Sequence, residues 1–215
     1  MNYKSELQNN NTDLASILET INALPEAGGD ASIEDAFVTR TITEYTNDRV
    51  NAIGNYAFTS CTSLTTVSFP VATFIGGSAF TRCYRLTTAS FPAATFIGNY
   101  AFSSCFSLTT ASFPVATSIG SYAFSNCFSL ATVSFPVATS IGGSAFTRCY
   151  NLISLYLTGS SLCALSASAA FTSTPIGGYS TSAGRYGSIF VPASLLASYK
   201  AATNWAYFSS RFVGI

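Results

Sequence analysis

Apolar residues recur every 22 residues along the chain from Ile53 onward. Five near-identical units follow one another, and each holds an isoleucine, a phenylalanine, a cysteine and a leucine in the same phase. The in-phase positions are Ile53, Ile75, Ile97, Ile119 and Ile141; Phe58, Phe80, Phe102, Phe124 and Phe146; Cys61, Cys83, Cys105, Cys127 and Cys149; and Leu64, Leu86, Leu108, Leu130 and Leu152. Self-similarity at a fixed period of about 20–50 residues is the sequence signature of stacked repeats. The pattern therefore predicts a solenoid with one turn per unit.

The second half of each unit predicts a β-strand. Leu64, Val67 and Phe69 follow the L-x-x-V-x-F spacing of the strand in a leucine-rich repeat and should point inward, with threonine and serine facing solvent between them. Pro70 lacks an amide hydrogen and should close the strand. The Ile-Gly pair that opens each unit marks a turn, and the phenylalanine and cysteine after it should fill the core from the convex side. We expect a right-handed leucine-rich-repeat solenoid with one β-strand per turn.

The ends of the chain depart from the repeat and are expected to cap it. We assign an N-terminal helix and linker to residues 1–29, a cap with a degenerate repeat to residues 30–52, the repeats to residues 53–157 and a C-terminal cap to residues 158–215. Further strands are expected at 152–157 and 188–191, a loop at 172–187 and a helix over 194–202. Solenoids need such caps because their terminal turns would otherwise expose apolar residues.

The unit I-G-x-x-A-F-x-x-C-x-x-L-T-T-V-S-F-P resembles the BspA-like leucine-rich repeat of surface proteins from gut and oral bacteria. The resemblance covers residues 42–157, and the C-terminal stretch IFVPASLLASYKAATNW is similar to the end of such proteins and of some prophage-encoded ones. It implies a binding or adhesion module at a cell surface or on a virion. The start of the chain, MNYKSELQNNN, shows no secretory signal. Aromatic residues follow the cysteines where the family often has small ones.

The N-terminal segment over residues 3–24 has apolar residues in heptad phase, with Asn10 at one seam position. It predicts either a helix that packs on the first turn or a short coiled coil that joins chains as a homo-oligomer. The segment also resembles leader segments of phage tail proteins, which would make the chain a structural spacer or assembly subunit. The residues that would carry oligomerisation are Leu7, Leu14, Ile17, Ile21 and Leu24.

Charge is distributed unevenly. Residues 1–48 hold nine acidic and two basic side chains, a net of −7, whereas residues 49–215 hold seven basic and no acidic ones, a net of +7. Seven positive charges over so long a stretch form no dense patch, so we expect no nucleic-acid partner. The chain has no apolar run of about 18 residues, so we expect no membrane span.

Catalysis has few candidate groups. The chain has no histidine, and the repeats have no carboxylate side chain, so acid–base pairs and nucleophile–base pairs are missing there. We therefore expect no enzyme activity and no cofactor. The five cysteines lack the C-x-x-C spacing of zinc sites, and stacked side chains cannot reach disulfide geometry easily. We interpret them as buried free thiols; Cys163 lies off the period and is left unassigned.

The candidate binding surface is a row of aromatic residues, Tyr84, Phe106, Phe128 and Tyr150, which we call the outer aromatic ladder. The arginines beside it are Arg82, Arg85 and Arg148, and a second partial row holds Tyr56, Tyr100 and Tyr122. Aromatic rings with arginine suit protein or glycan ligands. The alternative is that the rings only stabilise the stack of turns. Columns of threonine and serine on the strands are a second candidate, with plain solvation as the alternative. We expect a non-catalytic binding module.

Overall fold

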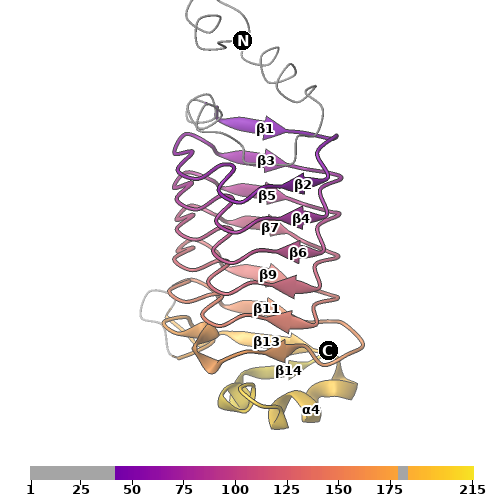
Figure 1. The fold of residues 1–215 in the computed structure, drawn as a ribbon. Helices are drawn as coiled ribbons and strands as arrows, with labels where there is room; N and C mark the ends of the chain where they lie inside the picture. The colour runs from indigo at the N-terminus through magenta and orange to yellow at the C-terminus, as the bar shows by residue number, and fades with distance from the viewer. Residues whose placement is uncertain (1–41, 179–183) are drawn as a thin grey trace, which may run out of the picture. The chain divides into compact units, whose positions relative to one another are not determined.

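The computed structural model describes residues 42–178 and 184–215. These residues form a stack of parallel turns (Figure 1). The expected helix over 3–24, its oligomerisation residues and the linker after it lie outside the described residues. The domain boundaries assigned above stay predictions.

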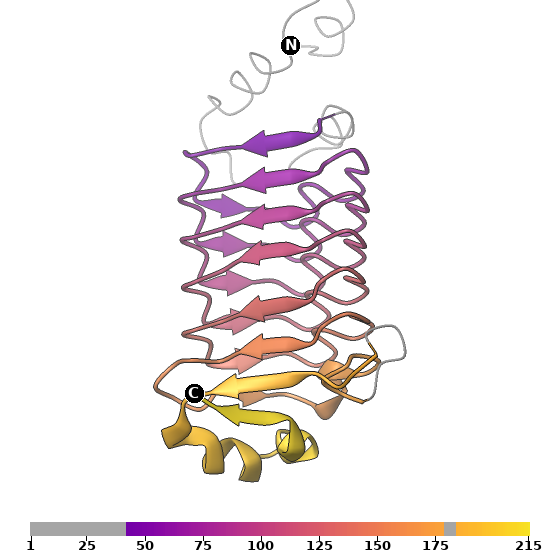
Figure 2. The ribbon, with the colours of Figure 1, turned by 180° about the vertical axis from the view of Figure 1, so that it is seen from behind.

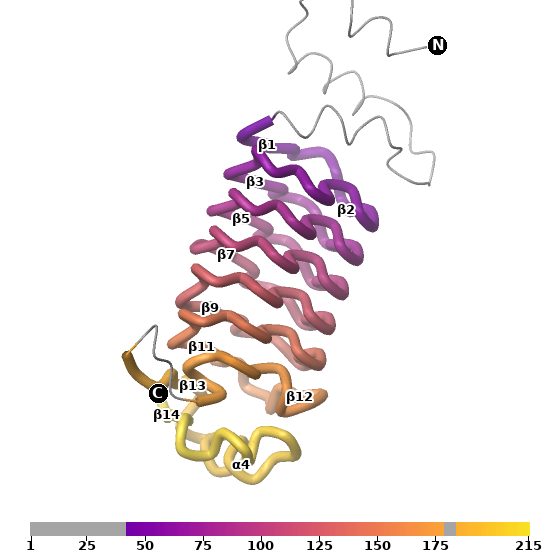
Figure 3. Tube along the Cα trace, turned by 90° about the vertical axis from the view of Figure 1, so that its left-hand side faces the viewer, coloured from indigo at the N-terminus to yellow at the C-terminus, as the bar shows by residue number. Residues whose placement is uncertain are grey.

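Six turns contribute two strands each, rather than the single one expected from the sequence. The longer strands are β1 (Glu44–Thr46), β3 (Thr66–Ser68), β5 (Thr88–Ser90), β7 (Thr110–Ser112), β9 (Thr132–Ser134), β11 (Ser154–Tyr156), β13 (Ser188–Val191) and β14 (Phe212–Gly214). The shorter ones are β2 (Ala52–Ile53), β4 (Phe74–Ile75), β6 (Phe96–Ile97), β8 (Ser118–Ile119), β10 (Ser140–Ile141) and β12 (Ala164–Leu165). The isoleucine of the Ile-Gly pair therefore ends a short strand, and the glycine follows it. The long strands run along one side of the stack (Figure 2), and β2 and β12 lie on the opposite side (Figure 3).

The in-phase apolar residues line one continuous interior, as predicted. The isoleucine, phenylalanine, cysteine and leucine columns are all buried, and the strand residues Val67 and Phe69 are buried with them. Phenylalanine rings of successive turns stack in parallel: Phe80 and Phe102 lie 5.1 Å apart between ring centroids, and Phe102 and Phe124 lie 5.4 Å apart. A second column packs edge-on against the first, as Phe91 does against Phe102. Such offset and edge-to-face pairs stabilise a core beyond the burial of their area.

A column of glycines lets the short-strand side of the turns approach closely. A Cβ atom added to Gly98 would lie 2.6 Å from the carbonyl carbon of Gly76 in the preceding turn. The amide of Gly98 also donates to the carbonyl of Ile75 at 2.8 Å. Gly120 and Gly142 are equally close to the turns before them, whereas no atom of the described residues lies within 4 Å of the corresponding position at Gly54. A side chain at Gly76, Gly98, Gly120 or Gly142 would therefore clash with the backbone of the turn before it.

Threonine hydroxyls add a ladder of hydrogen bonds between turns. Oγ1 of Thr87 donates to the carbonyl of Thr65 at 2.9 Å, and Oγ1 of Thr109 donates to the carbonyl of Thr87 at 3.1 Å. A parallel ladder follows the short strands, where Oγ1 of Thr117 donates to the carbonyl of Thr95. These bonds bind the edges of each turn to the turn before it.

The long-strand sheet is interrupted between the third and fourth turns. Strand β7 ends one four-stranded sheet and β9 ends another, whereas the short strands from β2 to β12 form one continuous sheet. The rings of Phe113 and Phe135, which follow these two strands, lie 6.3 Å apart, against 5.6 Å for Phe91 and Phe113. Ala131 stands here where the first three turns carry the bonding threonine. We call this interruption the seam.

The C-terminal cap covers the last turn, as expected, with the helix α4 (Leu196–Ala201) beside β13 and β14. Short 3-10 helices flank it at Ser168–Phe171, Ala193–Leu195 and Ala206–Arg211. The indole Nε1 of Trp205 donates to the carbonyl of Cys163 at 2.7 Å, and the amide of Cys163 donates to the hydroxyl of Tyr199 at 3.0 Å. Trp205, Tyr199 and Cys163 are all buried. The off-period cysteine therefore lies at the contact between the cap and the last turns.

Candidate ligand-binding surface

Two residues in every repeat adopt the left-handed backbone region, with φ between 56° and 63°. One column holds Tyr56, Ser78, Tyr100, Tyr122 and Ser144, and the other holds Ser60, Arg82, Ser104, Asn126 and Arg148. Left-handed backbone costs about 1–2 kcal/mol for a residue with a Cβ atom, and glycine or asparagine is the usual occupant. Backbone preference therefore does not account for tyrosine and arginine there. Strained residues of this kind often lie at functional sites.

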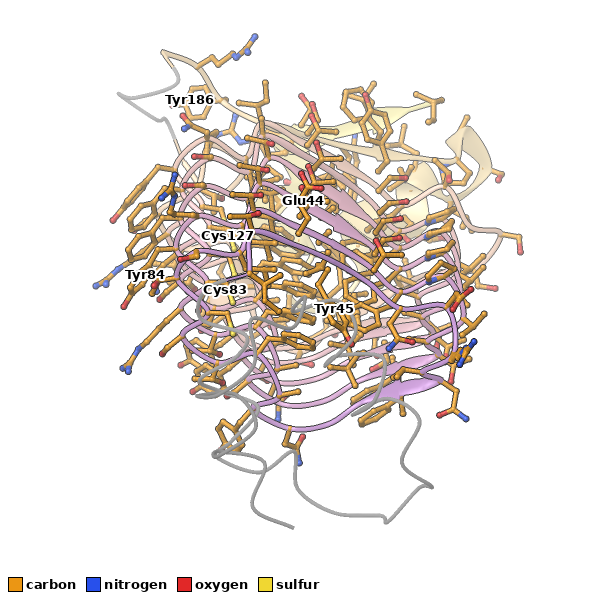
Figure 4. The ribbon with its side chains drawn as sticks, turned by 90° about the horizontal axis from the view of Figure 1, so that it is seen from above. Glu44, Tyr45, Cys83, Tyr84, Cys127 and Tyr186 are labelled. Atoms are coloured by element: carbon orange, nitrogen blue, oxygen red, sulfur yellow. The ribbon has the colours of Figure 1, made fainter. Side chains whose placement is uncertain are left out.

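The outer aromatic ladder is formed as the sequence predicted. The ring centroids of Tyr84 and Phe106 lie 4.9 Å apart, those of Phe106 and Phe128 4.7 Å, and those of Phe128 and Tyr150 5.2 Å. Tyr84 and Phe106 each expose 37% of their surface and Tyr150 exposes 39%, whereas Phe128 is half-buried. Figure 4 shows Tyr84 outside the stack and Cys83 inside it. The four rings thus form a continuous aromatic strip at the surface.

The arginines of the candidate site are all exposed. Arg82 and Arg148 are in the left-handed column, and Arg85 directly follows Tyr84. The only side-chain carboxylates among the described residues belong to Glu44 and Asp48, in the first turn. The repeats therefore offer these guanidinium groups no acidic side chain, and the side of the stack with the outer aromatic ladder is positively charged.

The strand hydroxyls form the regular columns that the sequence predicted. Thr66, Thr88 and Thr110 are paired in register, as are Ser68, Ser90 and Ser112. On β11 and β13 the serine column gives way to Tyr156 and Phe190, whose rings stack at 4.5 Å. The columns are partly exposed to solvent.

The cysteines form a buried column of free thiols, as interpreted from the sequence. The Sγ atom of Cys83 donates to the carbonyl of Phe58 at 3.0 Å, and each later cysteine repeats this contact with the phenylalanine 25 residues before it. A hydrogen bond with the thiol of Cys105 and burial raise the pKa of Cys83, and burial raises the pKa of Cys127. Burial raises the pKa of Cys163 to about 12. These thiols therefore stay protonated at neutral pH.

We expect the native protein to resist alkylation at every cysteine, because only the thiolate reacts, all six thiols are buried, and burial raises the pKa of Cys127 and Cys163. Treatment with iodoacetamide at about pH 8, below the ordinary thiol pKa, should leave all six cysteines unmodified by mass spectrometry. The same treatment in denaturant should modify all of them. Rapid labelling of any cysteine in the folded protein would contradict the interpretation of the column as inert.

A metal site or a catalytic site would need a group of metal-ligating or titratable side chains that lie together among the described residues. No cluster of three metal-ligating side chains occurs in residues 42–178 and 184–215. Lys200, the one lysine there, lies on α4, and Glu44 and Asp48, the two carboxylates of the first turn, have no histidine beside them. None of the helices in these ranges is long and apolar enough to cross a membrane.

The sequence analysis did not identify two further ring pairs at the surface. Phe74 and Phe96 stack at 4.9 Å on β4 and β6, and both are exposed. The other pair, Tyr156 and Phe190, joins β11 to β13. The signal for the first pair was present, since the two phenylalanines are one period apart and directly precede the isoleucine column.

The repeat geometry agrees with a comparison of the sequence with known families. The profile described as "BspA type Leucine rich repeat region" matches residues 34–153 as six copies, which is more than half of the chain. The chain belongs to the BspA-type leucine-rich repeat family. None of the curated proteins matches the sequence significantly.

One solved leucine-rich repeat structure has a similar fold at low sequence identity, and two others match less well. A leucine-rich repeat protein from Bacteroides ovatus has a TM-score of 0.60 and 21% identity, covering 81% of this chain and 43% of its own. A Treponema pallidum leucine-rich repeat protein and a leucine-rich cell surface protein from Faecalibacterium prausnitzii give TM-scores of 0.44 and 0.40, each at 21% identity and over 71% of this chain. The matches cover 60% of the Treponema protein and 55% of the Faecalibacterium protein. The chain thus spans less than two thirds of each relative.

Proposed function

We propose that this BspA-type protein is a non-catalytic binding module that recognises a protein or glycan ligand through the outer aromatic ladder. The observation that carries the proposal is the exposed strip of four stacked rings, Tyr84 to Tyr150, bordered by arginines with no acidic side chain nearby. Aromatic residues and arginine dominate the energetics of binding surfaces. Presentation at a bacterial cell surface or on a virion is part of the proposal and is supported by the resemblance of the repeat unit.

Two further observations support binding over a purely structural role for these rings. The interior already holds two columns of stacked phenylalanines, so the turns have ample ring contacts without the outer ladder. Arg82 and Arg148 also occupy left-handed backbone that an asparagine or glycine would adopt more easily. A ligand that stacks on the rings and contacts the guanidinium groups gives both features a role.

The test replaces three rings of the ladder with threonine, the residue that Thr62 places in the same column of the first turn. The variant Y84T/F106T/F128T and the parent chain are probed on glycan and protein arrays. We expect the ligands of the parent to lose at least about tenfold in affinity for the variant, because hot-spot contacts contribute on the order of 2 kcal/mol or more.

The matched control is F74S/F96S, since Ser118 and Ser140 occupy the same short-strand column in later turns. It removes an exposed ring pair of similar size elsewhere on the stack and should keep the ligands. Ligands retained by the ladder variant would refute the proposal, as would equal losses in both variants.

Assembly through residues 3–24 is the competing function. It predicts that the chain binds no ligand on the arrays. It also predicts that light scattering shows an oligomer, which becomes a monomer when residues 1–29 are removed. A monomer with and without those residues would rule it out.

A further inference from the structure

The left-handed column that holds Tyr56, Tyr100 and Tyr122 carries a serine, Ser78, where a further tyrosine ring would complete it. Tyr56, Ser78, Tyr100 and Tyr122 occupy the same place in four successive turns. Tyr100 and Tyr122 stack at 4.8 Å with an angle of 1° between their planes. Ser78 therefore interrupts a ladder that has a tyrosine on both sides of it.

The backbone is the same at the interruption as at the rings. Ser78 has φ of 56°, against 62° for Tyr56 and 59° for Tyr100. The amide of Tyr56 donates to the carbonyl of Gly77 at 3.0 Å, and that of Ser78 donates to the carbonyl of Asn99 at 2.8 Å. The turns thus keep their register through this position, and only the side chain differs. Gly77 before Ser78 adds no side chain that could replace the ring.

The space left by Ser78 has the thickness of one ring. The 4.8 Å spacing of Tyr100 and Tyr122 shows that neighbouring turns of this column hold rings within stacking range, since parallel rings stack at centroid distances of about 4.5–7 Å. One ring position is therefore vacant at Ser78, between the turns of Tyr56 and Tyr100. Tyr56 exposes 68% of its surface, against 44% for Tyr100 and 38% for Tyr122. No ring within residues 42–178 and 184–215 stacks on Tyr56. Both walls of the space therefore face solvent.

We propose that Tyr56, Ser78 and Tyr100 form a slot that takes an aromatic side chain presented by a partner protein, so that the partner's ring completes the ladder. The stacked Tyr100–Tyr122 pair is the template, since it shows how a phenol ring sits against this tyrosine. All three slot residues are uncharged, so the slot favours a neutral ring. It is distinct from the outer aromatic ladder and does not depend on the function proposed for that ladder.

The probe is N-acetyltyrosinamide, titrated into the isotope-labelled full chain and followed by NMR. A ring seated in the slot should move the signals of Ser78 upfield through the ring current, together with signals of Tyr56 and Tyr100. Methyl glucoside is titrated in parallel. Saturable shifts with the tyrosine derivative alone support the slot. Shifts with the sugar alone, or no localised shift with either compound, would overturn the aromatic assignment.

The decisive variant fills the slot from within. S78Y places a tyrosine at a backbone position that accepts tyrosine in three other turns. It should lower the affinity for N-acetyltyrosinamide by at least about tenfold. S144Y is the matched control, because Ser144 has the same left-handed backbone but a tyrosine, Tyr122, on only one side. Probe binding that survives S78Y, or is lost equally in S144Y, would overturn the proposal. Thermal unfolding of both variants verifies that they remain folded.

Discussion

Replacing Phe102 with alanine should lower the free energy of unfolding by about 3–5 kcal/mol, the range for large aromatic residues removed from a packed core. Phe102 is fully buried, stacks on Phe80 and Phe124, and packs against Phe91 and Phe113. Its removal leaves a cavity in the middle of the stack, which the rigid turns on either side cannot fill by moving closer. Chemical denaturation of the parent and the variant measures the loss.

The matched control is Phe106→Ala in the same turn. Phe106 also stacks on two neighbouring rings, but it exposes 37% of its surface and leaves no cavity when it is truncated. Its loss should cost about 1 kcal/mol, the contribution of exposed ring stacking. Equal losses for the two variants would contradict the assignment of the phenylalanine column as core and the outer aromatic ladder as surface.

Replacing Gly98 with alanine should also destabilise the protein strongly, by about 3 kcal/mol, the upper part of the range for an overpacked site. The new Cβ atom would lie 2.6 Å from the carbonyl carbon of Gly76, and backbone atoms cannot move aside as a flexible side chain can. Relief requires the two turns to separate, which would lengthen the hydrogen bond from Gly98 to Ile75. Denaturant unfolding again supplies the measurement.

Gly54→Ala is the internal reference for that prediction. Gly54 occupies the same position in the first unit, but no atom of residues 42–178 or 184–215 lies within 4 Å of the Cβ it would gain. Alanine there should leave stability unchanged or slightly raised, because it reduces the freedom of the unfolded chain. A large loss at Gly54, or none at Gly98, would show that contact between turns does not explain the glycine column.

Much of the fold follows from the sequence because the repeat shows which residues are buried. A residue type that returns every 22 positions must occupy the same environment in each turn, so the phenylalanine, cysteine and leucine columns could be assigned to the core. The two-residue short strands were missed because a strand of that length shows no alternation of apolar and polar residues. The seam at Ala131 was missed as well, since one changed residue in an otherwise regular unit gives no sign of a lost strand pairing.

The candidate site was predictable in position but not in conformation. Its aromatic residues are one period apart, and stacking follows from that spacing. Nothing in the identity of Tyr56 or Arg82 signals left-handed backbone, since glycine and asparagine are the residues that usually mark it. The slot at Ser78 likewise depends on register and spacing that only coordinates supply.

The seam between β7 and β9 divides the array into two blocks of unequal coupling. In a linear stack each turn is stabilised by its immediate neighbours, so cooperativity depends on the weakest junction. At this junction the short-strand sheet continues, and so do the backbone hydrogen bonds from the amides of Tyr100, Phe102 and Ser104 to the following turn. Local opening between the first three repeats and the capped remainder is therefore expected to begin at the long strands, where the pairing is interrupted.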